Sequence, residues 1–145
     1  HFNTWPRHCV AGTDGAHFHE RLYLDSNDII INKGMGQTDG YSGFEGVANR
    51  GLTIENLILP KARERVALAI GGLATDFCVL QTVLAALKAD QREGAVRVFV
   101  PTDAVRAVNL QPGDGDHALE QMAAAGAYLT TTTAILQQEA FRLAA

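Results

Sequence analysis

The sequence predicts an α/β fold, a three-layer α/β/α sandwich with a parallel sheet of the Rossmann-like kind. Two observations carry this prediction. Short apolar runs alternate with longer helical patterns along the chain, which is typical of parallel strands joined by helices. The runs are also largely apolar throughout, as DIIINK at 28–33 and VALAI at 66–70 illustrate, and such runs suit strands covered on both faces. A chain of 145 residues fits one domain, so we assign residues 1–145 to a single unit.

Four strands and four helices are predicted, in strict alternation. The strands run from Asp28 to Lys33, from Arg65 to Ile70, from Ala95 to Val100 and from Ala127 to Thr131. The helices run from Thr53 to Leu59, from Thr75 to Gln91, from Asp114 to Ala125 and from Ala134 to Leu143. Thr53 suits the cap of the first helix, Asp114 or Asp116 the cap of the third, and Gly126 its end.

A glycine-rich segment, Gly34 to Gly51, separates the first strand from the first helix. It holds six glycines around the sequence MGQTDGYSGFEG. Long loops inside compact domains are usually functional or disordered, and the aromatic residues here favour a functional loop. Residues His1 to Glu20 show no clean period and are predicted to be a loop as well.

Composition argues against two classes of partner. The formal charge is −4 and the 12 Lys and Arg residues are scattered, so no surface for nucleic acid is predicted. No apolar run reaches the roughly 20 residues that cross a bilayer, so no membrane partner is expected. Two cysteines are too few for a disulfide framework, which predicts a reducing compartment and a cytoplasmic location.

Cys78 lies where the segment GGLATDFCV leads from a strand into a helix. Backbone N–H groups and the helix dipole favour an anion there, and a thiolate is an anion. The same N–H groups are placed to hold an oxyanion on a substrate carbonyl. Position alone leaves a second interpretation open, a small residue that packs the helix against the sheet. Cys9 has no helix end to activate it, and we expect no nucleophilic role for it.

Lys33 ends a predicted strand at the same sheet edge as Cys78, because functional groups in parallel sheets gather beyond the carboxyl ends of the strands. Its charge would stabilise a thiolate, although a solvated lysine is the commoner case at a strand end. His1 and His8 flank a Trp-Pro pair and could share a metal ion, yet zinc sites use three or four protein ligands. His17 and His19 suit surface or structural positions, and His117 is assigned no role.

Three motifs resemble the nicotinamidase branch of the isochorismatase-like cysteine hydrolases. WPRHCVAGTDGA is similar to the metal-site loop of that family, NKGMGQTDGYSGFEG to its catalytic-lysine segment, and GGLATDFCV to its nucleophile turn. They occur in the family's order and extend from Trp5 to Val79. The strand and helix pattern beyond Val79 is compatible with the family but adds little.

By position, the resemblance implies roles for particular residues. Cys78 would be the nucleophile, Lys33 the catalytic lysine, and the N–H groups of Ala74 and Cys78 the oxyanion hole. The Leu73–Ala74 peptide would be cis. His8, together with His1, would bind a divalent metal, with zinc as the first choice and iron or manganese as alternatives. The substrate pocket would be walled by Trp5, Tyr41, Leu73 and Ala74.

Two features of the family pattern have no counterpart in this chain. They are a catalytic aspartate on a first strand and an Asp-x-His pair of metal ligands before the Trp-Pro loop. Asp28, Asp39 and Asp76 lie in other segments. We therefore expect the N-terminal strand, one member of the catalytic triad and half of the metal site to belong to a portion outside this chain.

The resemblance implies an amidohydrolase that converts nicotinamide to nicotinate and ammonia through a cysteine thioester. A bound metal would orient the pyridine ring of this small-molecule substrate. Two alternatives stay open: a hydrolase of another small amide on the same scaffold, or an inactive fragment or subunit of such an enzyme. Homo-oligomerisation also stays open.

Overall fold

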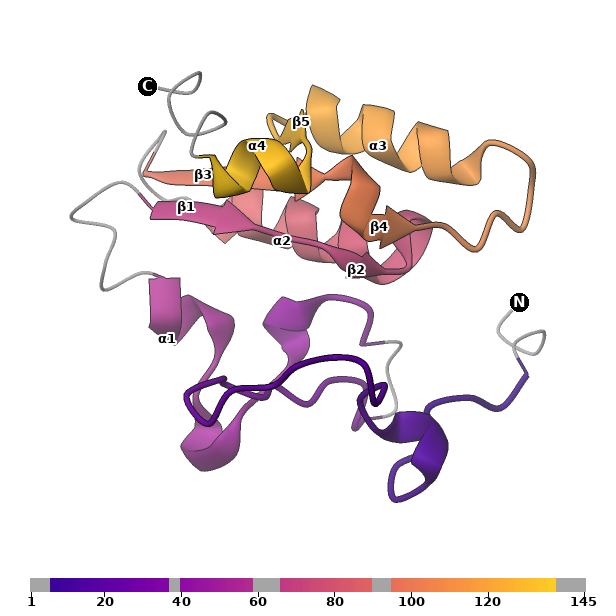
Figure 1. Ribbon diagram of the computed structural model, residues 1–145, viewed down its shortest axis with the longest axis vertical. Coiled ribbons are helices and arrows are strands. Elements are labelled where there is room, and N and C mark those ends of the chain that lie inside the picture. Colours follow the sequence, from indigo (N-terminus) through magenta and orange to yellow (C-terminus); the bar gives the residue numbers. More distant parts are fainter. Residues whose placement is uncertain (1–5, 37–39, 59–65, 90–94, 138–145) are drawn as a thin grey trace.

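The computed structural model describes residues 6–36, 40–58, 66–89 and 95–137 (Figure 1). Its strands are β1 (Val66–Ala69), β2 (Gly72–Leu73), β3 (Val96–Pro101), β4 (Val105–Arg106) and β5 (Tyr128–Thr130). Its α-helices are α1 (Ile54–Ile58), α2 (Leu80–Ala89), α3 (Asp114–Ala124) and α4 (Thr132–Leu136). A π-helical turn, Thr75–Val79, leads directly into α2.

The main sheet is parallel, as predicted, with the strand order β1-β3-β5. β2 and β4 form a second, two-stranded parallel sheet. Along β3, the buried side chains of Val96, Val98 and Val100 belong to the cluster that includes α2 and α3, whereas Phe99 packs against α4. Because neighbouring strand residues point to opposite faces, this division places the sheet between two helical layers. The three-layer α/β/α sandwich is confirmed.

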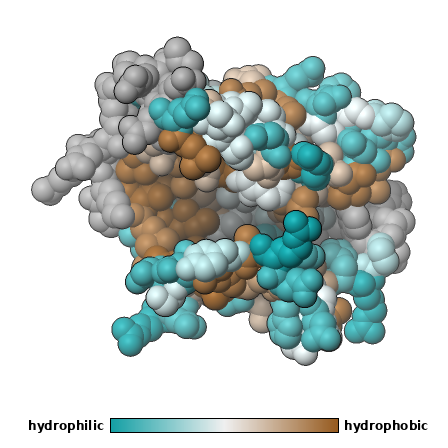
Figure 2. Space-filling model, in the orientation of Figure 1, coloured by the Kyte–Doolittle hydropathy of each residue, from teal (hydrophilic) through white to brown (hydrophobic). Residues whose placement is uncertain are grey.

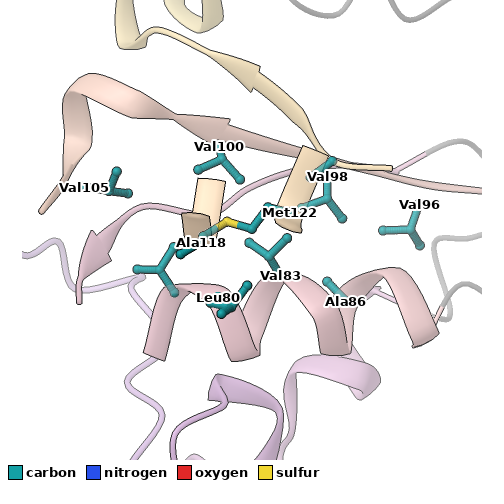
Figure 3. Close-up of a cluster of buried hydrophobic side chains, with 11 residues drawn as sticks. Leu80, Val83, Ala86, Val96, Val98, Val100, Val105, Ala118 and Met122 are labelled. Carbon is teal, nitrogen blue, oxygen red and sulfur yellow. The ribbon is translucent and has the colours of Figure 1, made fainter. Parts of the chain in front are cut away.

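The main core lies between the sheet and the α2–α3 pair (Figure 3). Val83 and Ala86 of α2 and Met122 of α3 are fully buried there, and Ala118 is 2% exposed. On α2 these positions repeat at helical spacing, so one face of the helix supplies the apolar stripe. The apolar face of α2 is therefore the face that it buries.

Residues 28–33 do not form the buried strand that the isoleucine run predicts. Asn32 makes an isolated antiparallel bridge with Val47, while Ile29 and Ile30 are 50% and 47% exposed. The reason is the lack of a sheet neighbour: within the described ranges, the main sheet ends at β1, and residues 28–33 lie apart from it (Figure 1). Figure 2 shows a hydrophobic area on this face, between β1 and the part of the chain before α1.

The helix ends differ from the prediction in detail. Thr53 does cap α1, because its Oγ1 accepts the Asn56 N–H at 3.3 Å. The N-cap of α3 is Gly113, not an aspartate. Asp114 instead turns its carboxylate back to the Gln111 N–H, at 2.8 Å.

The ends of α3 and the start of α4 are also defined by particular residues. Asn109 Oδ1 accepts the Gly115 N–H in the first turn of α3, at 2.8 Å. Gly126, with φ +107°, follows the end of α3 as predicted. α4 begins at Thr132, two residues before the predicted start, because Thr131 caps it by accepting the Ala134 N–H. Among the described residues, no helix combines the length and apolar character that a bilayer crossing requires.

Candidate active site

The structure brings Lys33 and Cys78 together from positions 45 residues apart. The Lys33 ammonium donates a hydrogen bond to the Cys78 sulfur, with 3.3 Å between Nζ and Sγ, and a second one to the Gly40 carbonyl at 3.0 Å. Cys78 is half-buried, so its sulfur is not sealed inside the core. A cation in contact with the sulfur is an arrangement found at nucleophilic cysteines. The pair is therefore arranged for nucleophilic chemistry.

The turn that carries Cys78 is built from an irregular backbone. Gly72 has φ +114°, a conformation that glycine adopts without steric cost, and the Leu73–Ala74 peptide is cis, as the resemblance implies. The Ala74 carbonyl then accepts the N–H groups of both Phe77 and Val79, at 3.1 and 3.0 Å, which closes the π-helical turn. Leu73 is 73% exposed and Ala74 is half-buried beside it.

Two side chains that sequence reasoning missed tie this turn to distant loops. Asp76 accepts the N–H groups of Val108 and Asn109, at 3.0 and 2.8 Å. The Thr82 hydroxyl donates to the Cys78 carbonyl at 2.6 Å and accepts the Gly43 N–H at 2.9 Å. The available signal was local: both are hydrogen-bonding residues within one helical turn of Cys78.

The rings of Tyr41 and Phe77 meet beside the turn, with their centroids 5.8 Å apart at an interplanar angle of 48°. Tyr41 is half-buried and follows Gly40, the residue whose carbonyl holds Lys33. The predicted wall residue Tyr41 thus lies next to the Cys78 turn, with Phe77 as a partner that the sequence did not single out. Trp5, the other predicted aromatic wall, lies outside the described residues.

The predicted metal ligands are only partly described. His8 is exposed, and its Nδ1 lies 2.7 Å from the Pro6 carbonyl, so Nδ1 carries the proton that the carbonyl accepts. His1 lies outside the described residues. Across the part of the chain that the structure describes, no three His, Cys, Asp or Glu side chains gather as a metal-binding group.

The remaining histidines and Cys9 make no such group either. His17 lies 3.6 Å from Asp14 on the surface, and His19 accepts the Arg21 N–H. These short-range contacts agree with the surface positions expected for the two histidines. Cys9 is exposed in its loop.

A surface cavity of about 230 Å³ lies between the π-helical turn and α3. Asp76, Asp114, His117 and Gln121 provide its polar lining. Neither Cys78 nor Lys33 lines it, so it is distinct from the candidate catalytic pair.

Comparison with known proteins identifies the family. Residues 2–134 match the isochorismatase domain. The chain belongs to the isochorismatase family. It is 40% identical to a nicotinamidase of Escherichia coli K12 over 128 residues, which are 88% of this chain and 57% of that protein. The family assignment agrees with the fold and with the motifs that surround Lys33 and Cys78.

Two solved structures share the fold. A Pyrococcus horikoshii pyrazinamidase in complex with zinc is 34% identical, with a TM-score of 0.69 over 88% of this chain and 63% of that one. PnC1 from L. infantum in complex with nicotinate is 28% identical, with a TM-score of 0.72 over 90% of this chain and 62% of that one. The chain thus spans less than two thirds of the length of each of these relatives.

Proposed function

We propose that this chain carries the nucleophile of an amidohydrolase that converts nicotinamide to nicotinate and ammonia. The observation that carries the proposal is the 3.3 Å contact between Lys33 Nζ and Cys78 Sγ. A half-buried thiol beside an ammonium, at the start of a helix, is suited to attack an electrophilic carbon. The nicotinamidase relative and the nicotinate-bound neighbour support the choice of substrate.

The proposed reaction has two stages, the formation of a thioester and its hydrolysis. A carboxylate base, the role that the resemblance gives to the family's aspartate, takes the thiol proton, and the Cys78 sulfur attacks the carboxamide carbon. The developing oxyanion is held by the N–H groups of Ala74 and Cys78. The C–N bond then breaks, the nitrogen takes the proton and leaves as ammonia, and a thioester remains. Water cleaves the thioester, which releases nicotinate and restores the thiol.

Lys33 has two tasks in this scheme. Its charge stabilises the thiolate, and its bond to the Gly40 carbonyl fixes the direction from which the ammonium approaches the sulfur. The Tyr41 and Phe77 rings offer an apolar surface beside the turn, which suits a flat pyridine ring. We propose Trp5, Leu73 and Ala74 as further walls of the pocket, as the resemblance implies.

His8 fits one position of a divalent metal site, with zinc as the first choice and iron or manganese as alternatives. Because Nδ1 donates to the Pro6 carbonyl, a neutral imidazole keeps its lone pair on Nε2, the arrangement usual for metal-binding histidines. A metal held by His8 and His1 would supply an electrophile that attracts the pyridine nitrogen. The zinc-bound Pyrococcus horikoshii neighbour supports this assignment.

The experiment measures ammonia release from nicotinamide and pyrazinamide, and pyruvate release from the vinyl ether isochorismate, with the wild-type protein and with Cys78→Ala and Cys9→Ala. We expect Cys78→Ala to lower amide hydrolysis by on the order of a thousandfold or more, as removal of a nucleophile does. Cys9→Ala is the matched control and should retain most of the activity. Equal losses in both variants would contradict the choice of nucleophile.

Two further results would separate the alternatives. A preference for pyrazinamide or another amide over nicotinamide would favour a different hydrolase on the same scaffold. A Cys78 thiol that resists iodoacetamide near neutral pH, together with no turnover of any amide, would favour an inactive fragment or subunit. The cytoplasmic location and homo-oligomerisation stay predictions.

A further inference from the structure

Thr82 connects two segments of the candidate site through one hydroxyl group. Its Oγ1 donates to the Cys78 carbonyl at 2.6 Å and accepts the Gly43 N–H at 2.9 Å. We propose that Thr82 is a positioning residue, which fixes the Gly40–Phe44 loop against the turn that carries Cys78 and thereby sets the contact between Lys33 and the sulfur. This inference rests on the proposed function.

The loop that Thr82 holds is the one that orients Lys33. Gly40 accepts the Lys33 ammonium, Tyr41 meets Phe77, and Gly43 is bound by Thr82, all within four consecutive positions. A shift at Gly43 therefore moves the carbonyl that aims the ammonium at Cys78. Only Tyr41 and Ser42 separate these two points, so the chain that could absorb such a shift is short.

The loop approaches Thr82 closely enough for the hydroxyl to control its position. A Cβ atom added at Gly43 would lie 3.4 Å from Thr82 Cγ2 and 3.1 Å from Ile54 Cδ1. Ser42 beside it is 5% exposed, and its Oγ accepts the Phe44 N–H at 3.1 Å. The loop is therefore seated on α2 and α1, with the Thr82 hydroxyl as a polar attachment.

Valine has the shape of threonine without the hydroxyl, so Thr82→Val removes both hydrogen bonds at little change in volume. Serine keeps the hydroxyl, so Thr82→Ser is the conservative control. The test uses a Cys9→Ala background, in which Cys78 is the one remaining thiol. The rate of Cys78 alkylation by iodoacetamide is measured from about pH 5 to pH 9, because alkylation follows the thiolate and needs no amide substrate.

We expect Thr82→Val to slow alkylation near neutral pH about fivefold, the net effect of losing the hydrogen bond to the Gly43 N–H that holds the loop. Thr82→Ser should stay within about twofold of the parent. Lys33→Met should slow alkylation as well. If Thr82 acts through Lys33, then Thr82→Val should add little in the Lys33→Met background, because the two changes share one contact.

Each outcome decides between the inference and the proposed function. If Lys33→Met slows alkylation but Thr82→Val does not, the role of Thr82 is refuted and the proposed function stands. If the two effects multiply in the double variant, Thr82 acts independently of Lys33 and the inference also fails. If Lys33→Met has no effect, the proposed function fails at its central contact. Should Thr82→Val not fold by circular dichroism, Thr82→Ala gives the same test with a better helix former.

Discussion

The most informative perturbation of the nucleophile turn is Asp76→Asn. The Asp76 carboxylate accepts two backbone N–H groups with separate oxygens, from Val108 at 3.0 Å and from Asn109 at 2.8 Å. Asparagine has a single acceptor oxygen, and its NH₂ group would face the second N–H as donor against donor. The substitution keeps the volume of the side chain and breaks one of the two bonds that join the turn to the loop before α3.

The expected cost follows from this geometry. Hydrogen bonds to charged groups contribute about 1.5–3 kcal/mol, and the low end applies because Asp76 is partly exposed and water can replace the lost partner. Asp114→Asn is the matched control. Asp114 also lies in the first turn of its helix, but it accepts one N–H, from Gln111, which an asparagine oxygen can still accept. Loss of the first-turn charge costs both variants about 0.5 kcal/mol. We therefore expect the free energy of unfolding to fall by about 2 kcal/mol in Asp76→Asn and by about 0.5 kcal/mol in Asp114→Asn.

Urea unfolding of the parent and of both variants measures these free energies. Cys78 alkylation, measured in the same samples, should also change in Asp76→Asn, because Asp76 and the Cys78 thiol belong to the same turn. Equal free energies of unfolding for Asp76→Asn and Asp114→Asn would refute the reasoning, since the two variants differ in the second hydrogen bond. A destabilised Asp76→Asn with unchanged alkylation would show that the hydrogen bonds of Asp76 stabilise the fold without positioning the thiol.

Three other predictions follow from packing and charge. Met122→Ala empties a fully buried position and should lower the free energy of unfolding by about 3 kcal/mol in urea. Gly46→Ala would place a Cβ 2.6 Å from the Ile31 Cγ2, so overpacking should cost about 1–3 kcal/mol and slow Cys78 alkylation. The Thr132 hydroxyl and N–H donate to Asp103 and hold its pKa below the ordinary 3.8. The contribution of Asp103 to stability is therefore present above pH 3.8 and is lost as the pH falls through the folded pKa. Asp103→Asn should remove that part of the acid dependence of the urea midpoint.

Controls for these variants come from positions with few contacts. Leu136→Ala, at a side chain 82% exposed, should change the free energy of unfolding by less than about 0.5 kcal/mol. Gly36→Ala adds a Cβ that meets none of the described residues within 4 Å. A Gly36→Ala variant as unstable as Gly46→Ala, or a Met122→Ala variant as stable as Leu136→Ala, would contradict the packing argument. An unchanged acid dependence in Asp103→Asn would contradict the assigned pKa direction.

The layered fold could be predicted because its signals are local. The apolar run in β3 and the 3.6-residue pattern of α2 each predict an element, and alternation of such elements predicts a parallel sheet. Residues 28–33 carry the same kind of run but form one isolated bridge. A run of isoleucines shows that a segment favours a sheet, whereas pairing depends on a neighbour elsewhere in the chain. The sequence pattern therefore predicted the propensity of this segment and not its pairing.

The candidate site was predictable residue by residue but not as an arrangement. Cys78 could be placed at the start of a helix from sequence, whereas the strand expected to end at Lys33 does not form. The 3.3 Å contact between the two side chains spans 45 positions, which no local pattern encodes. Asp76 and Thr82 escaped detection because their partners are backbone N–H groups 32 to 39 residues away. Any residue type can supply a backbone N–H, so no motif in those loops marks the bond.

These long-range bonds suggest how the site is held. The Cys78 turn is attached on one side to the loop before α3 through Asp76, and on the other to the Gly40–Phe44 loop through Thr82. Asp76 of the turn and Thr82 of α2 both accept from loop backbone, so loop sequences can vary while the attachment persists. The Lys33 contact, in contrast, depends on one side chain reaching one sulfur. A loop substitution that preserves backbone geometry should therefore be tolerated. Loss of the Asp76 carboxylate or the Thr82 hydroxyl should instead change the rate of Cys78 alkylation, although neither group touches the Cys78 sulfur.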